Sequence, residues 1–257
     1  MIDLHTHILP GVDDGATDLE MALAMGRFAA DGGITTIAVT PHFYEIPKWS
    51  LVQEKVAELR RAFEEAQIAV ELVPGAELLL DMDLLDMSVQ DIPTYGDQGR
   101  FCLVEFPLQQ MPIYVEQVLF GLQAKGLTPI IAHPERYGAV VENPNLVLDW
   151  LRQGCLIQMN TGSILGRFGP VVQETAKIML RSHMVQVVAS DAHGSVRRRL
   201  NLPETFSTLV EIVGESTALE LVEANPQGIL RGDFRLKTEP VEYHKKRRSF
   251  FSRLGWK

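Results

Sequence analysis

The chain has 257 residues, of which 46% are hydrophobic and 22% charged, and its formal net charge is −9. This composition is typical of a globular protein, and the negative charge argues against general nucleic-acid binding. No apolar run is long enough to span a membrane, the N-terminus does not resemble a signal peptide, and two cysteines make no disulfide framework. We therefore expect a cytoplasmic protein.

Short strands rich in β-branched residues alternate with helices along the chain. The predicted strands cover residues 2–7, 34–40, 68–73, 101–106, 128–132, 155–159 and 185–189. The predicted helices cover residues 17–31, 50–67, 112–125, 143–154, 169–182, 203–213 and 216–224, and residues 78–98 are expected to hold a short helix or two. Thr17 with Glu20, and Ser50 with Gln53, have the spacing of capping boxes and predict the first two helix starts.

About seven strand–helix units predict an α/β fold with a parallel sheet. Such a sheet forms either a barrel, whose chemistry lies at the carboxyl ends of the strands, or an open doubly wound sheet with one crevice. Polar residues within or just after six of the seven strands favour the barrel, because an open sheet would not bring all these strand ends together. We expect one domain, residues 1–240, followed by a flexible basic and aromatic tail, residues 241–257.

Five of the seven histidines stand at strand ends, and carboxylates stand with them. The set comprises His5, His7, His42, His133, His193, Glu77, Glu105 and Asp191. Imidazoles mixed with carboxylates suit manganese, iron, cobalt or zinc, whereas magnesium or calcium would call for mostly oxygen ligands. One ion cannot use so many ligands, so we predict two or three ions, an arrangement that holds phosphoryl groups for in-line attack. The alternative is that these are structural histidines and ordinary surface acids.

Six short motifs in order carry a family resemblance. They are His-Thr-His at 5–7, Thr-Pro-His at 40–42, Pro-Gly-Ala-Glu at 74–77, Val-Glu-Phe at 104–106, Ala-His-Pro-Glu-Arg at 132–136 and Ser-Asp-Ala-His at 190–193. They resemble the PHP superfamily (polymerase and histidinol phosphatase), which implies a distorted (β/α)7 barrel with a trinuclear metal centre. Val-Asp-Asp-Gly at 12–15 and the extension of the fifth motif to Tyr137 resemble the bacterial manganese-dependent protein-tyrosine phosphatases encoded with capsule and exopolysaccharide genes. The resemblance runs from Met1 to about Arg231.

The resemblance also implies which residues bind the metals. The first ion would take His5, His7, Glu77 and Asp191, the second Glu77, Glu105 and His133, and the third Asp14, His42 and His193. Asp13 competes with Asp14 for its place, and the resemblance favours Asp14. Manganese is the expected metal, with iron, cobalt and zinc as alternatives.

Two arginines are expected to hold the phosphate, because a guanidinium offers a planar fork to two phosphate oxygens. Arg136 follows His133 by three residues, and the resemblance places a phosphate-binding arginine at Arg198. Arg197 and Arg199 leave that second choice open. Asp191 and His193 are both candidates for the general acid.

The sequence fits other phosphatase chemistries less well. A thiol-based tyrosine phosphatase needs an arginine six residues after its cysteine, but Leu108 and Thr161 stand at those positions after Cys102 and Cys155. A histidinol-phosphate phosphatase is the nearest enzymatic alternative. A non-catalytic barrel that serves as a binding module is the alternative from another class.

We therefore predict metal-assisted hydrolysis of protein phosphotyrosine. The resemblance implies that the substrate is the tyrosine-rich tail of a membrane-associated bacterial tyrosine kinase that regulates capsule or exopolysaccharide synthesis. The aromatic residues Phe43, Tyr44, Phe106 and Tyr137 lie beside ligands in the sequence and are candidates to contact the phenyl ring. In residues 245–257, six cations and several aromatic side chains predict peripheral contact with the inner membrane face, against the alternative of a solvated end.

Overall fold

The computed structural model describes residues 1–236 and 238–244. Its strands are β1 (Ile2–Thr6), β2 (Thr36–Val39), β3 (Glu71–Pro74), β4 (Glu77–Leu79), β5 (Phe101–Glu105), β6 (Thr128–Ala132), β7 (Leu156–Asn160) and β8 (Val187–Ala189). Its α-helices are α1 (Leu19–Asp31), α2 (Trp49–Glu65), α3 (Val115–Ala124), α4 (Gly138–Glu142), α5 (Leu146–Arg152), α6 (Thr161–Ile164), α7 (Pro170–Arg181), α8 (Leu202–Val213), α9 (Glu215–Leu219) and α10 (Asn225–Leu230). Short 3-10 turns at Met82–Leu85, Val89–Asp91, Tyr95–Asp97 and Pro134–Arg136 and a π-helical turn at Glu220–Ala224 complete the described elements.

The strands follow one another in sequence order around a barrel, and each pair of neighbours is parallel. β1, β2 and β3 form one sheet, and β4 to β8 form a second. β3 and β4 are two parts of one extended segment interrupted at residues 75–76, so the described strands occupy seven positions. Isolated bridges join Thr6 to Ala192 and His42 to Glu77 and connect the two sheets. The predicted distorted (β/α)7 barrel is confirmed, and the interruption is part of its distortion.

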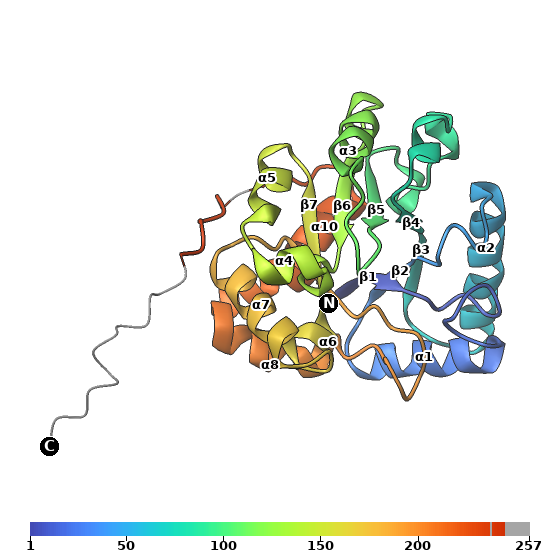
Figure 1. The fold of residues 1–257 in the computed structure, drawn as a ribbon. Helices are drawn as coiled ribbons and strands as arrows, with labels where there is room; N and C mark the ends of the chain where they lie inside the picture. The colour runs from blue at the N-terminus through green and yellow to red at the C-terminus, as the bar shows by residue number, and fades with distance from the viewer. Residues whose placement is uncertain (237, 245–257) are drawn as a thin grey trace, which may run out of the picture.

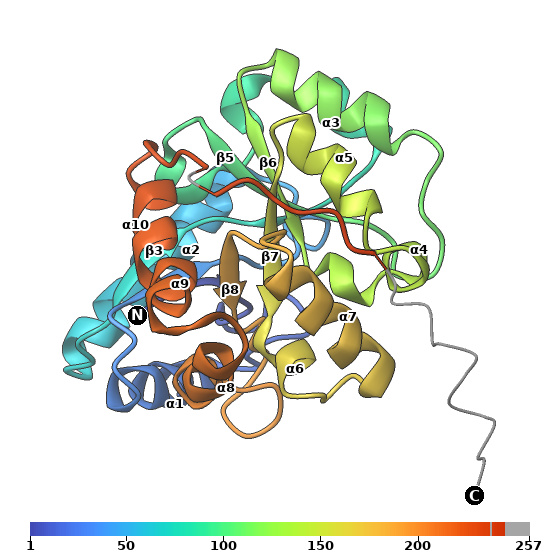
Figure 2. The ribbon, with the colours of Figure 1, turned by 90° about the vertical axis from the view of Figure 1, so that its left-hand side faces the viewer.

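The helices lie on the outside of the strands, as the two views in Figures 1 and 2 show. Their apolar faces pack against the strands in one large cluster of buried side chains. A second, smaller cluster combines strand residues with Tyr95 and with residues of α10 and Phe234. Burial of both clusters is the main force that holds the barrel together.

Side chains on the strands change character from one end of the barrel to the other. Phe101 begins β5 within the smaller apolar cluster, and Glu105, four residues later on the same face, ends it. On β7 the apolar Leu156 is followed on its face by Gln158 and Asn160, all buried. This face is therefore apolar where the strands begin and polar where they end, which puts the polar site at the carboxyl ends.

The first two helices start differently from the prediction. The N-cap of α1 is Asp18, which accepts a 2.8 Å hydrogen bond from the N–H of Met21, while the Thr17 hydroxyl donates to Asp18. A carboxylate in this position outcompetes the neighbouring hydroxyl because it accepts the helix N–H with a full charge. α2 already includes Ser50, and no side chain caps its start, so the second capping box is also wrong.

The predicted boundary at residue 240 falls within a segment that packs on the barrel. The N–H of Val241 donates to the Ser182 carbonyl at 2.8 Å. Asn145 exchanges two hydrogen bonds with the backbone of Tyr243, at 2.8 and 2.9 Å. Residues 241–243 therefore belong with the barrel, and the segment for which membrane contact is predicted, residues 245–257, lies outside the described residues. In the described part, no helix combines the length and the apolar character needed to cross a membrane.

Candidate metal centre

All nine predicted metal ligands lie together at the carboxyl ends of the strands. They are His5 and His7 on and after β1, Asp14 in the following loop, His42 after β2, Glu77 on β4, Glu105 on β5, His133 after β6, and Asp191 and His193 after β8. Seven of them, with Tyr44, Leu108, Arg136 and Arg198, line one open cavity of about 220 Å³. The site therefore collects side chains from nearly the whole length of the chain.

Three of the site residues have left-handed backbone, which non-glycine residues seldom adopt. The φ angles are 36° at His133, 52° at Asp191 and 47° at Arg198. Barrel hydrogen bonds hold the first two: His133 donates its N–H to the Gln158 carbonyl at 2.8 Å, and Asp191 donates to the His5 carbonyl at 2.9 Å. Such strain costs about 1–3 kcal/mol per residue and is typical of functional sites. Here it lies at the ends of β6 and β8, where the side chains turn into the site.

The first group of ligand atoms centres on His5 and His7. Their Nε2 atoms lie 3.2 Å apart, and Oε2 of Glu77 lies 3.2 and 3.3 Å from them. Oδ1 of Asp191 lies 3.6 and 3.5 Å from the same two nitrogens. These four residues are the ones predicted for the first ion.

The second group surrounds the other side of Glu77. Nδ1 of His42 lies 3.2 Å from Oε2 of Glu77 and 3.4 Å from Oε1 of Glu105. His133, predicted for this ion, approaches Oε1 of Glu77 at 3.0 Å but Oε2 of Glu105 only at 3.9 Å. The structure thus adds His42 to the residues predicted for the second ion. His133 lies close to Glu77 but farther from Glu105.

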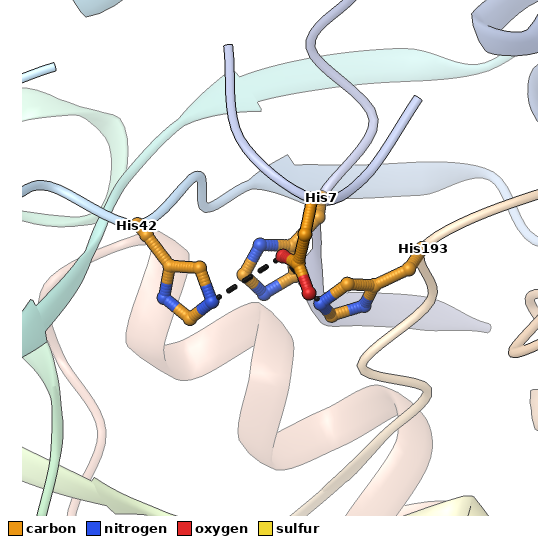
Figure 3. A group of neighbouring side chains, drawn as sticks. His7, His42 and His193 are labelled. Atoms are coloured by element: carbon orange, nitrogen blue, oxygen red, sulfur yellow. Dashed lines mark ion pairs between the residues drawn. The ribbon is translucent and has the colours of Figure 1, made fainter. Parts of the chain in front are cut away.

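The third group contains His7, His42 and His193, which converge from three separate segments in Figure 3. Asp14 completes it: its Oδ1 lies 3.2 Å from Nε2 of His193 and 3.5 Å from Nε2 of His42. The prediction named three of these four residues. His7, assigned to the first ion, also reaches this group because its ring stacks on that of His193 with the centroids 3.9 Å apart.

The two adjacent aspartates have different partners. Oδ2 of Asp13 accepts hydrogen bonds from Nδ1 of His7 at 2.8 Å and from the N–H of His42 at 3.0 Å, and its Oδ1 accepts from the N–H of Gly15. A Cβ atom at Gly15 would overlap the His7 carbonyl, so only glycine allows this tight loop. Asp13 therefore fixes the His7 ring, and Asp14 is left free to face the other histidines.

Burial and mutual charge set the protonation of the site. Burial alone would raise the pKa of Glu77, but the positive charge of His5 and hydrogen bonds from the surrounding histidines hold it well below its usual range. Burial would lower the pKa of His7, yet hydrogen bonds to Asp13 and Glu77 raise it to about 10. Burial, and then the charge of His7, lower the pKa of His193 to about 4. At neutral pH and without a metal, the raised pKa of His7 favours its protonated form, and the lowered pKa of His193 favours its neutral form.

The donor set fits divalent metal ions. Three groups of His, Asp and Glu side chains each bring their ligand atoms within 4.8 Å of one another. In the described residues, the buried Nδ1 of His42 lacks a hydrogen-bond partner although it faces two carboxylates. A cation at such a position can be bound by carboxylate oxygens and by the lone pairs of neutral imidazoles together. Mixed nitrogen and oxygen ligands of this kind suit borderline ions.

The structure separates the three consecutive arginines. Arg198 lines the cavity, and its Nη2 lies 2.9 Å from Oδ2 of Asp191. Arg136 reaches the same oxygen at 3.3 Å, and its guanidinium lies over the ring of Phe168. Arg199 pairs instead with Glu204, and the cavity lining includes neither Arg197 nor Arg199. Arg136 and Arg198 therefore stand where both were predicted.

Of the four aromatic residues proposed for the phenyl ring, only Tyr44 lines the cavity. Phe43, Phe106 and Tyr137 are buried, and the last two stack on each other with centroids 5.2 Å apart. Tyr137 also joins two strands, because its hydroxyl donates to the Ala132 carbonyl and accepts the N–H of Phe106. These three are packing residues, so their proposed contact with substrate is wrong.

The sequence reasoning missed two buried amides, Gln158 and Asn160, that contact predicted ligands. Gln158 lies 2.9 Å from His5, and Asn160 donates to Asp191 at 2.6 Å. Both stand on β7, the strand to which no ligand had been assigned. The signal was present, since two amides two residues apart in an otherwise apolar strand must share one face.

Comparisons with known proteins place this site in a family. Residues 1–231 match the family model described as "Capsular polysaccharide synthesis, CpsB/CapC". Tyrosine-protein phosphatase YwqE of Bacillus subtilis (strain 168) is 33% identical over 253 residues, which cover 95% of this chain and 98% of that protein. A chain from the crystal structures of YwqE and of CpsB from Streptococcus pneumoniae, described as metal-dependent tyrosine phosphatases, matches with a TM-score of 0.89 and 31% identity over 95% of this chain and 100% of its own.

A more distant match concerns the fold alone. Histidinol phosphate phosphatase from Lactococcus lactis, solved with zinc, histidinol and phosphate, has a TM-score of 0.51 and 14% identity, over 83% of this chain and 95% of its own. At this identity the likeness extends to the barrel and not to the substrate.

Proposed function

The chain belongs to the CpsB/CapC family of capsular polysaccharide synthesis, and from this premise we propose that it is a metal-dependent tyrosine-protein phosphatase acting on the tyrosine-rich tail of a bacterial tyrosine kinase. The relatives that support the enzyme class cover almost the whole chain, site included. The kinase is the finer part of the proposal and rests on the family's connection with capsule synthesis.

One observation carries the proposal: metal ligands and two arginines share a single open cavity. Metal ions bound there would supply Lewis acidity and lower the pKa of water for attack on phosphorus. Arg136 and Arg198 both line this cavity and contact the same oxygen of Asp191, so together they can hold a dianionic phosphate and stabilise its equatorial oxygens. Asp13 holds the His7 ring so that its Nε2 faces Glu77.

The rim of the cavity supports an aryl ester as substrate. Tyr44 is half exposed and stacks on the ring of His42, with centroids 5.1 Å apart. Leu108, also partly exposed, lines the same cavity. The phenyl ring of a phosphotyrosine whose phosphate is bound in the cavity could pack on these two side chains. Its phenolate, with a pKa near 10, is a good leaving group. The open cavity also suits a substrate attached to a polypeptide.

We propose manganese as the metal on the strength of the family resemblance, and the five imidazoles and four carboxylates are compatible with it. Iron, cobalt and zinc share this preference and are the other outcomes of the test. Elemental quantification of protein purified without chelators should find two or three equivalents of manganese per chain. Less than one equivalent of any divalent ion would contradict the metal-dependent mechanism.

Substrate choice tests the enzymatic part of the proposal. The metal-loaded protein should hydrolyse a phosphotyrosyl peptide with a kcat/KM at least tenfold above that for histidinol phosphate or a phosphoseryl peptide, and chelation should abolish the activity. A preference for histidinol phosphate would favour the alternative enzyme. Metal binding without hydrolysis of any of the three would favour a non-catalytic module.

Variants at Tyr44 test the rim. Tyr44→Ala should lower kcat/KM for the phosphotyrosyl peptide by a few-fold up to about tenfold, because an aromatic pair contributes about 0.5–1.5 kcal/mol. Tyr44→Phe should keep the activity. Phe120→Ala is the matched control, because Phe120 is an exposed aromatic residue on α3 outside the cavity lining.

A further inference from the structure

β7 supplies none of the predicted metal ligands, yet its end is polar. Gln158 and Asn160 are 0% and 1% exposed and share one face of the strand. Burying an amide away from water is unfavourable unless its donor and acceptor both find partners. These two amides do find partners, and the partners at both ends are metal ligands.

The contacts form a continuous path from one ligand to the other. Oε1 of Gln158 lies 2.9 Å from Nδ1 of His5. Nε2 of Gln158 donates to Oδ1 of Asn160 at 2.9 Å, and Nδ2 of Asn160 donates to Oδ2 of Asp191 at 2.6 Å. Each amide thus uses its oxygen on one side and its nitrogen on the other.

The direction of this path is fixed by Asp191. An ionised carboxylate only accepts hydrogen bonds, so Asn160 must turn its NH₂ group toward it. The Asn160 oxygen then faces Gln158 and can only accept, which makes Gln158 the donor in the next bond. The Gln158 oxygen is left for His5, whose Nδ1 must therefore carry the hydrogen. The charge of one ligand thereby sets the tautomer of another through two neutral side chains.

We propose that Gln158 and Asn160 are positioning residues for the metal centre, an inference that rests on the proposed metal dependence. With its hydrogen on Nδ1, His5 keeps the lone pair of Nε2, which lies 3.2 Å from Oε2 of Glu77, available to bind the first ion. Asn160 holds Oδ2 of Asp191 away from this position and leaves Oδ1 to face the histidines. Partners of this kind behind metal ligands typically change metal affinity 10–100-fold.

Two substitutions break the path at different points. Gln158→Met nearly conserves volume but removes the acceptor for His5. Asn160→Asp conserves shape but replaces the donor facing Asp191 with a second carboxylate oxygen. Each variant should bind one equivalent of manganese at least tenfold more weakly in competition with a chelator, whereas the metal-free forms should still unfold cooperatively.

Matched controls come from two other buried amides. Gln186 accepts the N–H of Ile157 at 2.9 Å, and Asn201 accepts the Thr161 hydroxyl at 2.7 Å. Neither has a hydrogen bond to a predicted ligand. Gln186→Met and Asn201→Asp should therefore keep the manganese affinity of the wild type, whatever they cost in stability.

The tautomer gives a readout independent of activity. In the zinc-loaded protein, which is diamagnetic, ¹⁵N–¹H correlation spectra should show His5 protonated at Nδ1, and this signal should be lost or exchange-broadened in Gln158→Met. If both Gln158→Met and Asn160→Asp keep the manganese affinity of the wild type, or if the controls lose as much, the positioning role is wrong and the proposed function still stands. Failure of the wild type to bind metal would overturn the proposed function as well.

Discussion

Arg198 and Asp191 are joined by a 2.9 Å hydrogen bond from Nη2 to Oδ2, while Oδ1 of the same carboxylate faces the metal-ligand histidines. One carboxylate therefore connects the residues that would bind metal with those that would bind phosphate. Arg136 shares the Oδ2 atom at 3.3 Å. The two arginines are thus held beside the candidate metal centre by the protein itself.

Arg136→Ala and Arg198→Ala are expected to keep their metal and lose catalysis. Each removes a charge-assisted contact with phosphate worth about 1.5–3 kcal/mol, so kcat/KM for a phosphotyrosyl peptide should fall at least tenfold. Asn160 still holds Asp191 in both variants, which is why the metal should stay. Arg199→Ala serves as the control, since Arg199 pairs with Glu204 outside the cavity. Unchanged kinetics in both variants would mean that metals alone hold the phosphate.

Glu77→Gln is expected to lose more than one equivalent of metal. The Glu77 carboxylate lies within 3.3 Å of His5, His7 and His42 through Oε2 and 3.0 Å from His133 through Oε1, so it can bridge two ions. An amide there keeps the shape but loses the charge and one acceptor. Metal content measured after gel filtration tests this expectation.

The control for Glu77 is another buried carboxylate. Glu135 is fully buried but hydrogen-bonds to Asn160 N–H and the Ser163 hydroxyl, not to the histidines. Glu135→Gln should retain all metal. Full metal content and activity in Glu77→Gln would show that its bridging role is wrong.

Asp3→Asn is expected to stabilise the metal-free protein at neutral pH. Asp3 is buried on β1, its Oδ1 accepts the N–H groups of Ser190 and His5, and its Oδ2 has no hydrogen-bond partner among the described residues. Burial raises the pKa of Asp3 from 3.8 to about 6. Between these values the folded state holds a proton that the unfolded state has lost, so stability falls as pH rises through this window. Above pH 6 the shift in the pKa of Asp3 corresponds to a loss of about 3 kcal/mol in the free energy of unfolding.

The pH dependence separates this effect from simple repacking. Urea unfolding of metal-free wild type and Asp3→Asn should give similar stabilities near pH 3.5 and a growing advantage for the variant up to about pH 6. Asp31→Asn, at an exposed position on α1, should show no such trend. A difference that does not vary with pH would mean that Asp3 is not held protonated by burial.

The basic segment after the barrel predicts salt-sensitive membrane contact. Residues 241–257 carry six cations against one acid, Glu242, and clustered cations attract anionic lipid at roughly 1 kcal/mol each. Because Val241 and Tyr243 bind the barrel, the informative truncation ends at His244. At low salt the full chain should sediment with anionic vesicles and the truncated chain should not, while both hydrolyse soluble phosphopeptide equally. Equal sedimentation of the two chains, or none of either, would exclude this mode of attachment.

The order of the barrel strands, and most of the residues that gather at the candidate metal centre, could be predicted from the sequence alone. Short apolar strands alternating with helices specify parallel strands, and the chemistry of such a barrel lies where strands end. The sequence position of a histidine or carboxylate directly after a predicted strand is therefore enough to place it near the site. The pair at 5 and 7 needed only the two-residue periodicity of extended chain, whereas Asp191, whose φ is 52°, lies outside extended chain and was assigned from the family resemblance.

The tertiary structure alone decided which of several adjacent residues faces the site. The sequence offers identical side chains at adjacent positions, as in Asp13 and Asp14 or in Arg197 to Arg199. Backbone geometry decides which of them faces the site, because Gly15 allows the close loop and Arg198 has a left-handed φ. Which aromatic residues are buried likewise depended on packing between distant segments, as with Phe106 and Tyr137. The path from His5 to Asp191 joins residues 186 positions apart through β7, because hydrogen bonds between side chains depend on which strands become neighbours and not on local sequence.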